Sequence, residues 1–356
     1  MKIKKNFSLK KYNSLKIDAK AKLFVEIKTV EELQRMIKKK YFVDNKFFIL
    51  GEGSNVLFTE DFDGLVVKNS ITSVFIMDKD IWEVNDAIEI TASSGIKFDD
   101  MIQKFLEFQK ENNLSIFGLE NLAKIPGSVG SAVVQNIGAY GIELKDLFYD
   151  CIVVDLKNRE YYNRYCILDK TRCCFGYRNS IFKQKENPYF IIKVSFKIDR
   201  KNVIPSLNYP ALREKFENIT PNEITPQLVY DTVSKIRESK LPSKEEYPNA
   251  GSFFKNPIIT KNKFISLKLL YPDIVFYDLE DETQKNKVKI SAAWLIEKCG
   301  LKGRRIGDVG ISEKHSLILV NYGKATGKEV VNFANYVIYE VKKKIGVKIE
   351  PEVVYV

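Results

Sequence analysis

The sequence has a single histidine, His315, in 356 residues. One histidine is too few for a histidine-based metal centre or a histidine acid–base pair. The five cysteines are odd in number and no two of them form a C-x-x-C pair, which argues against a disulfide framework and a zinc ribbon. We expect no metal, so the chemistry must come from other residues or from a cofactor.

Long hydrophobic runs are also missing. No apolar run approaches the length of a bilayer crossing, and the lysine-rich residues 1–12 lack the apolar segment of a secretory signal. Hydrophobic residues make up 45% and charged residues 29%, as in ordinary soluble globular proteins, and the length allows two or three domains. We therefore expect a cytoplasmic protein without a membrane partner.

The net charge of +11 raises nucleic acid as a partner. The lysines, however, are scattered among carboxylates on amphipathic segments, and no DNA- or RNA-binding motif is present. Solvated helix faces explain most of this charge, and a positive field also suits a phosphorylated small substrate. We expect no nucleic acid partner, and a basic nucleic-acid-binding protein stays a remote alternative.

The spacing of apolar residues predicts a mixture of helices and strands. A capping box over Thr29–Glu32 opens a helix, and the strand 47–50 then leads into a glycine turn. The chain leaves that turn in a strand, followed by an acidic turn with Asp63-Gly64 at its tip and a second strand. Further expected elements are strands at 87–95 and 347–356, helices at 97–111, 226–241, 291–299 and 326–346, and an antiparallel sheet over 147–199.

The first glycine loop, residues 51–55, resembles a nucleotide site at first sight. A dinucleotide fingerprint needs a third glycine and a following helix, whereas this loop has Val56 at that position and continues into a strand. A P-loop fails as well, because no Gly-Lys-Ser/Thr follows. Taken alone, such a loop is more often a tight turn than a phosphate site.

A second loop changes that balance. Glycines alternate with serines and alanines from Gly118 to Gly141, which leaves few side chains to block the main chain. Successive main-chain N–H groups in such a segment can bind anions. Two loops of small residues in one half of the chain suggest one extended cofactor that lies across both.

Six motifs occur in the order found in the UDP-N-acetylenolpyruvoylglucosamine reductase family, which the chain resembles from about Tyr12 onwards. They are "LGEGSNVLF", "GLENLAKIPGSVGSAVVQNIGAYG", "YRNSIFK", "NAGSFFKNP", "AAWLIEKCGLKG" and "IEPEV". The resemblance implies an α+β fold, in which a vanillyl-alcohol-oxidase-type FAD-binding domain of two subdomains is joined to an α+β substrate-binding domain. The implied boundaries are 1–71 and 72–225 for the subdomains, 226–346 for the substrate domain, and 347–356 for a strand that returns Glu352 to the active site.

The resemblance also implies FAD and NADPH as cofactors and a UDP-sugar as substrate, and we expect a monomer. FAD would be held mainly by main-chain groups and small side chains. The implied residues are Gly51, Gly53, Ser54, Asn55, Ile125, Pro126, Gly127, Ser128, Gly130, Ser131, Asn136, Gly138, Ala139, Tyr140, Gly141 and Arg237.

Reduction of an enolpyruvyl ether needs a hydride, a proton donor and stabilisation of extra negative charge on a carboxylate, and reduced flavin can supply the hydride. Without the family, Arg178 reads as a surface arginine, Ser252 as a turn serine and Glu352 as an exposed glutamate. The resemblance assigns them instead to charge stabilisation, proton donation and the acid partner. Three residues depart from the family pattern: Asn179, where aspartate is usual, Ser14, where threonine is common, and Glu52, where a small residue is usual.

By the same resemblance, substrate would be held by Tyr177 beside the arginine, and its UDP part by Tyr209, Lys240, Asn256 and Lys302. The position of Tyr209 implies the subgroup with a tyrosine-bearing substrate loop. We interpret the chain as an FAD-dependent, NADPH-oxidising reductase that makes UDP-N-acetylmuramate for peptidoglycan. The nearest alternative is another flavoprotein of this fold that oxidises an alcohol or a sugar, and the three assigned catalytic residues argue against it.

Overall fold

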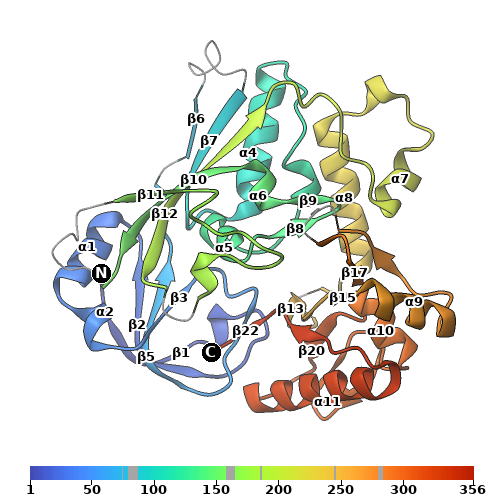
Figure 1. The fold of residues 1–356 in the computed structure, drawn as a ribbon. Helices are drawn as coiled ribbons and strands as arrows, with labels where there is room; N and C mark the ends of the chain where they lie inside the picture. The colour runs from blue at the N-terminus through green and yellow to red at the C-terminus, as the bar shows by residue number, and fades with distance from the viewer. Residues whose placement is uncertain (74, 79–86, 158–164, 185–186, 244–245, 280–283) are drawn as a thin grey trace. The chain divides into compact units, whose positions relative to one another are not determined.

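The computed structural model describes residues 1–73, 75–78, 87–157, 165–184, 187–243, 246–279 and 284–356 (Figure 1). The chain forms two compact units. The first comprises residues 1–7, 21–52 and 63–237, and the second comprises residues 8–20, 53–62 and 238–356. One division falls inside the first glycine loop, between Glu52 and Gly53, so each unit is built from segments far apart in the sequence. The predicted boundaries at residues 71 and 225 stay predictions.

A four-stranded sheet of order β1-β2-β5-β3 begins the first unit. Its strands are Lys4–Ser8, Lys20–Ile27, Phe62–Asn69 and Phe47–Leu50, and the helices α1 (Val30–Lys38) and α2 (Tyr41–Asp44) precede β3. The Thr29 side chain accepts the backbone N–H of Glu32, which confirms the predicted helix start. Leu33, Met36 and Ile37 on α1 pack into the core of this sheet.

The predicted acidic hairpin is wrong in one respect. Asp63 and Gly64 lie inside β5 and not at the tip of a turn. The reason is that β4 (Val56–Leu57) does not pair with β5, which instead lies parallel to β3. No two-residue hairpin turn is therefore formed there.

The second sheet of the first unit is antiparallel, in the order β11-β10-β12-β7-β6 (Figure 1). Its strands are Cys166–Asp169, Phe148–Asp155, Tyr189–Asp199, Ala87–Ser93 and Phe75–Asp78, which confirms the predicted strand near 87–95 and the antiparallel sheet over 147–199. Helix α4 (Phe98–Glu111) buries its apolar stripe in the same core. The shorter elements of this unit are α5 (Val129–Val134), β8 (Gly138–Ala139), β9 (Ile142–Glu143), α6 (Leu144–Leu147), α7 (Pro210–Phe216) and most of α8 (Pro226–Lys240).

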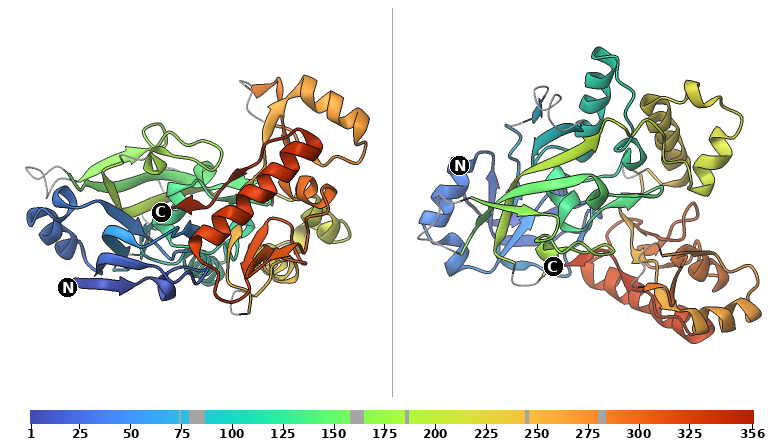
Figure 2. Two further views of the ribbon diagram at one scale, coloured as in Figure 1. Left: turned by 90° about the horizontal axis from the view of Figure 1, so that it is seen from below. Right: turned by 45° about the horizontal axis from the view of Figure 1, so that its top comes forward.

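The second unit contains a sheet of order β13-β20-β19-β18, with strands Asn249–Ser252, Ile318–Asn321, Val309–Ile311 and Arg305–Ile306. Helix α11 (Gly327–Ile345) packs against β19 and α10 (Ala292–Lys298), and Figure 2 shows it running along its unit. Its capping box at Thr326 and its left-handed Gly346, with φ of 78°, lie where the sequence predicts them. A second sheet holds β15 (Ile258–Thr260), β17 (Lys287–Ile290) and β16 (Phe276–Tyr277), next to α9 (Lys261–Leu270).

The predicted strand 347–356 is two short strands with different partners. β21 (Glu350–Pro351) pairs antiparallel with β14 (Phe254–Lys255), and β22 (Val354–Tyr355) pairs parallel with β4. Both pairings stay within the second unit. Across the part of the chain that the structure describes, no helix is both long and apolar enough for a membrane crossing.

A buried carboxyl group lies in the core of the first unit. Glu120 is 2% exposed, and its Oε2 accepts the backbone N–H of Gly118 at 2.7 Å. Burial raises the pKa of this carboxyl from 4.5 to about 7, and the hydrogen bonds from the backbone oppose that rise. Between pH 4.5 and about pH 7, the Glu120 carboxyl is therefore mostly protonated in the folded state and mostly ionised in the unfolded chain.

This difference makes stability depend on pH. Wild-type protein is expected to lose free energy of unfolding as the pH rises from about 4.5 to about 7, in total about 3 kcal/mol relative to a group that does not titrate. Glu120→Gln should remove this loss, because glutamine does not titrate. The free energy of unfolding of the variant minus that of the wild type should therefore increase by about 3 kcal/mol between pH 4.5 and pH 8. Urea unfolding at a series of pH values measures the gap, and parallel profiles for the two proteins would contradict the prediction.

Candidate active site

The two glycine-rich loops meet in the first unit. A Cβ added to Gly51 would lie 3.0 Å from the Ser128 Oγ and 3.1 Å from the Ser131 Cβ, so the first loop lies directly on the start of α5. A Cβ on Gly130 would lie 2.7 Å from the Ser94 Cβ, and the Gly130 N–H donates to the Ser94 carbonyl at 2.8 Å. Small residues at these positions therefore allow the backbones to approach each other.

Glu52 forms an ion pair with the Nζ of Lys68. The two side chains are 32% and 13% exposed, and Lys68 lies opposite Leu50 in the parallel β3–β5 pairing. The same Nζ reaches the Asn69 carbonyl at 3.4 Å, and the Asn69 amide donates to the Ser94 Oγ at 2.7 Å. A chain of polar contacts thus runs from Glu52 in the first loop to Ser94, which contacts Gly130 of the second loop.

The other half of the first loop belongs to the second unit. Gly53 has a φ of 64°, and a Cβ there would lie 2.0 Å from the Tyr12 carbonyl oxygen, so only glycine fits. The Asn55 carbonyl accepts the Val354 N–H at 3.1 Å, and the Asn55 amide reaches the Glu352 carbonyl at 3.4 Å. The loop is therefore bonded directly to β22 and to Glu352, which lies between β21 and β22.

Ser252 and Glu352 lie on neighbouring backbones of the same unit. The Glu352 N–H donates to the Phe253 carbonyl at 2.7 Å, next to the β14–β21 pairing. Ser252 is exposed and Glu352 is half-buried. The second unit thus brings together three segments, 53–55, 252–253 and 352. Main-chain hydrogen bonds and the side-chain amide of Asn55 join them.

Arg178 belongs to the first unit and lies on a tight turn. Its φ of 53° is in the left-handed region, and its guanidinium donates to the carbonyls of Asn136 at 3.3 Å and Gly138 at 2.7 Å. It also lies over the Tyr177 ring, 5.3 Å from the centroid. The fork of the guanidinium is therefore fixed on the second glycine-rich loop.

The turn itself closes through its backbone. Gly176 and Asn179 exchange two main-chain hydrogen bonds of 3.0 and 3.1 Å. The Asn136 amide donates to the Gly176 carbonyl at 3.1 Å, and the Ser180 hydroxyl donates to the Val134 carbonyl at 2.6 Å. These bonds hold the turn without the aspartate expected at position 179.

Tyr140 connects the end of the second loop to three other segments. Burial raises the pKa of its hydroxyl, which hydrogen-bonds Arg237 on α8. Its ring meets the Tyr209 ring edge-on at 5.1 Å, and the Asn121 amide donates to the carbonyls of both Tyr140 and Ser206 at 2.8 Å. Among the described residues, the buried Nε of Arg237 has no hydrogen-bond partner. A buried, unused cationic donor fits an acceptor-rich group such as a phosphate.

The remaining predicted substrate residues have structural contacts of their own. Tyr209 lies in the first unit, whereas Lys240, Asn256 and Lys302 lie in the second. The Asn256 Oδ1 accepts the Ala292 N–H at 2.9 Å, at the start of α10, and Lys302 forms an ion pair with Glu297 at 3.2 Å. Lys240 is the exposed last residue of α8. Their roles toward a substrate stay predictions.

Two family models match the chain: the FAD binding domain at residues 21–154 and the C-terminal domain of UDP-N-acetylenolpyruvoylglucosamine reductase at residues 242–356. The reductase of Flavobacterium johnsoniae is 40% identical over 354 residues, which cover 99% of each chain. That of Buchnera aphidicola subsp. Baizongia pistaciae is 40% identical over 350 residues, 97% of each chain. The chain belongs to the UDP-N-acetylenolpyruvoylglucosamine reductase family. It is an FAD-containing oxidoreductase of peptidoglycan synthesis.

The crystal structure of UDP-N-acetylenolpyruvylglucosamine reductase from Thermus caldophilus has the same fold. It matches 100% of this chain and 99% of its own, with a TM-score of 0.65 and 22% sequence identity. The predicted fold class, an α+β FAD-binding domain of the vanillyl-alcohol-oxidase type with an α+β partner, is confirmed. The family predicted from the six motifs is confirmed as well.

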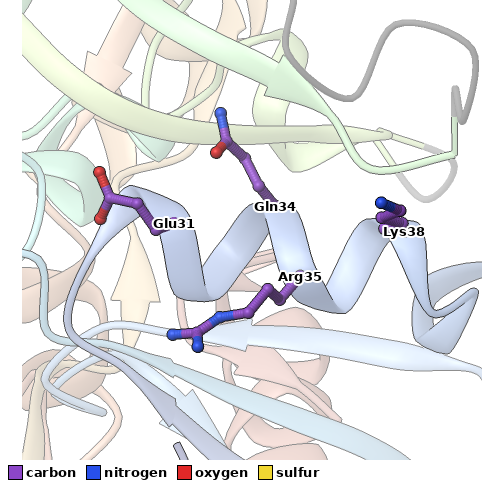
Figure 3. Close-up of a pocket in the computed structure, with 4 residues that line it drawn as sticks. All are labelled: Glu31, Gln34, Arg35 and Lys38. Carbon is purple, nitrogen blue, oxygen red and sulfur yellow. The ribbon is translucent and has the colours of Figure 1, made fainter.

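A surface hollow of the first unit is lined by none of the residues predicted for a reductase of this family. It is lined by Glu31, Gln34, Arg35 and Lys38. Figure 3 shows that all four project from the single helix α1, with Arg35 and Gln34 pointing to opposite sides. Side chains that diverge from one helix do not converge on a ligand, so we assign no function to this hollow.

Sequence reasoning in terms of the reductase family missed Lys68 and Asn249. Lys68 is far from Glu52 in the sequence and meets it only through strand pairing. The sequence pattern that could have indicated Lys68 is a lysine at the end of a strand next to an acidic glycine loop. Asn249 holds the turn before Ser252, with the N–H of Gly251 bonded to its Oδ1 at 3.0 Å, and its signal was an asparagine two residues before a glycine.

Proposed function

We propose that the protein reduces UDP-N-acetylglucosamine enolpyruvate to UDP-N-acetylmuramate, with NADPH as the electron source and FAD as the resident cofactor. The supporting observation is the hydrogen bond from the Glu352 N–H to the Phe253 carbonyl, which puts the two proposed proton-handling residues on adjacent backbones. We also propose a cytoplasmic monomer without a nucleic acid partner.

The proposed FAD contacts are those of the two glycine-rich loops. Gly51, Gly53, Ser54 and Asn55 would lie along the pyrophosphate, and the segment 125–141 would cover the rest of it and the flavin ring. The unused Nε of Arg237 supports a phosphate contact. When bound and reduced, the flavin supplies the hydride.

Arg178 is proposed to stabilise the negative charge that grows on the substrate carboxylate. Its guanidinium is already oriented by the carbonyls of Asn136 and Gly138. A preoriented cation needs little reorganisation when charge develops, which is the main source of electrostatic catalysis. Tyr177, whose ring lies under the guanidinium, limits the directions in which the fork can turn.

Ser252 is proposed to give the proton to the carbon that bears the carboxylate, with Glu352 as its acid partner. A serine hydroxyl that only passes a proton needs no histidine, but it needs a nearby group that stabilises its charge. The UDP part would be held by Tyr209, Lys240, Asn256 and Lys302.

The visible spectrum of the purified protein tests this function. The proposal predicts a yellow protein that bleaches when NADPH is added without oxygen and regains its colour when the enolpyruvyl substrate follows. A colourless protein that takes up no FAD would refute the flavin chemistry. Bleaching without recovery on the enolpyruvyl substrate would favour another flavoprotein reaction.

The Glu52–Lys68 pair gives a prediction for cofactor affinity. Lys68→Met leaves a partly buried carboxylate unpaired beside the proposed pyrophosphate, so the Kd for FAD should rise about tenfold. Glu52→Gln should change the Kd for FAD by less than about threefold, and the Kd of the double variant should be close to that of wild type. These values correspond to a coupling energy of about 1.4 kcal/mol between positions 52 and 68. Titration of apoprotein with FAD, followed by flavin fluorescence, measures all four proteins.

Lys22→Met is the matched control for this cycle. Lys22 also pairs with a carboxylate of the first unit, Asp63, but these side chains are 60% and 85% exposed. An exposed pair contributes little, so FAD affinity should not change. A Lys68→Met effect that persists unchanged in the double variant would show that the pairing with Glu52 is not the cause.

A further inference from the structure

The strand that ends at Ser252, β13, has one residue more than β20 between its two paired positions. From Asn249 to Ser252 the chain advances three positions, while β20 advances two, from Val320 to Ile318, and the register shifts between them. The extra residue is a β-bulge. Bulges bend a strand and re-aim the side chains that follow.

Asn249 and Gly251 build this bulge. Gly251 has a φ of 73°, which is left-handed and suits glycine. The buried Asn249 accepts the Gly251 N–H on its Oδ1 at 3.0 Å, and its amide donates to the Tyr247 carbonyl at 2.8 Å. The asparagine side chain therefore clamps the backbone on both sides of Ala250.

The bulge decides which way Ser252 points. In a regular strand, residues two apart share a face, so Ser252 would face the same side as Ala250, which is buried. With the extra residue, Ser252 lies opposite Ile318, on the side of Asn249 and away from the side that Ala250 faces. Its side chain is exposed at the end of β13. The next residue is fixed, because the Phe253 N–H donates to the Leu317 carbonyl at 2.7 Å and its carbonyl accepts the Glu352 N–H at 2.7 Å.

We infer that Asn249 and Gly251 are positioning residues for proton transfer: the clamped left-handed bulge presents the Ser252 hydroxyl toward the substrate, beside the backbone of Glu352. The inference rests on the proposed function. Neither residue touches the reacting atoms. Both act through the backbone of Ser252, so they should affect the step that needs the proton and not the step in which NADPH reduces the flavin.

Stopped-flow measurement of the two half-reactions on the FAD-loaded protein tests this inference. No described residue lies within 4 Å of a Cβ added to Gly251, so substitutions there act through φ and not through a clash. Asparagine tolerates left-handed backbone better than alanine does. Bleaching by NADPH should stay within about twofold of wild type, while reoxidation by the enolpyruvyl substrate should slow by about 100-fold in Gly251→Ala and less in Gly251→Asn.

Gly346→Ala is the matched control. Gly346 has a similar φ of 78°, and in the described part of the chain nothing lies within 4 Å of an added Cβ, but it ends α11. It should lower the Tm about as much as Gly251→Ala and leave both half-reactions unchanged. Asn249→Ala should slow reoxidation like Gly251→Ala. Asn249→Asp keeps the oxygen acceptor, so its reoxidation rate should fall between those of wild type and Asn249→Ala.

Reoxidation at the wild-type rate in Gly251→Ala, despite its lower Tm, would overturn the inference. Equal slowing of both half-reactions would overturn it too, because a general structural defect would then explain the effect. Failure of the proposed function looks different, since the wild-type protein itself would not be reoxidised by the enolpyruvyl substrate.

Discussion

Arg178→Lys is expected to slow reoxidation of the reduced flavin by the enolpyruvyl substrate about 100- to 1000-fold, with reduction by NADPH nearly unchanged. Lysine keeps the positive charge but has no planar fork. The guanidinium of Arg178 bonds the carbonyls of Asn136 and Gly138 at once, at 3.3 and 2.7 Å. A single ammonium on a flexible stem cannot keep that orientation and also meet a carboxylate.

Arg172→Lys is the control for this change. Arg172 precedes the same turn, is exposed, and uses one Nη to bond the Ile167 carbonyl at 3.3 Å. Its replacement should leave both half-reactions within about twofold of wild type, as is usual for exposed sites away from special contacts. If Arg178→Lys were as active as Arg172→Lys, charge alone would suffice and the oriented fork would have no role.

Gly53→Ala is expected to have the other large effect, on both stability and cofactor binding. The left-handed φ of 64° would cost alanine roughly 1–2 kcal/mol. The new Cβ would also lie 2.0 Å from the Tyr12 carbonyl oxygen, so the backbone must move. We expect a total loss of about 3–5 kcal/mol in the free energy of unfolding.

The displaced loop should also bind FAD about 100-fold more weakly, a loss of about 3 kcal/mol in binding free energy, because its main-chain groups move away from the proposed pyrophosphate site. Thermal melting of apoprotein and FAD titration measure the two effects separately. Gly346→Ala, which has the same φ class but open space around it, should lose only roughly 1–2 kcal/mol and keep its FAD affinity. Wild-type FAD affinity in Gly53→Ala would remove this loop from the cofactor site.

The sequence predicts those features that depend on neighbours along the chain. The helix beginning after Thr29 and the one beginning after Thr326 follow from capping residues, and the buried faces of α4 follow from a period of 3.6 residues. The first glycine loop was correctly predicted to continue into a strand, because its failure as a dinucleotide motif is itself a local property.

Features that depend on strand pairing were harder to predict. Asp63-Gly64 has the composition of a hairpin turn, yet the strand before it pairs with Val354–Tyr355, nearly the whole chain away. The Glu52–Lys68 pair depends on the parallel register of β3 and β5. Neither contact leaves a periodic signal, because the register of two distant strands is set by their packing and not by either strand alone.

The parallel pairing of β4 with β22 has a consequence for the newborn protein. Val56 leaves the ribosome about 300 residues before Val354, an interval of about 15–60 s at about 5–20 residues per second. During that interval the loop at 53–55 lacks the strand to which Asn55 is bonded in the finished fold. With the proposed FAD contacts at this loop, nascent chains are therefore expected to bind FAD only after translation has passed Tyr355.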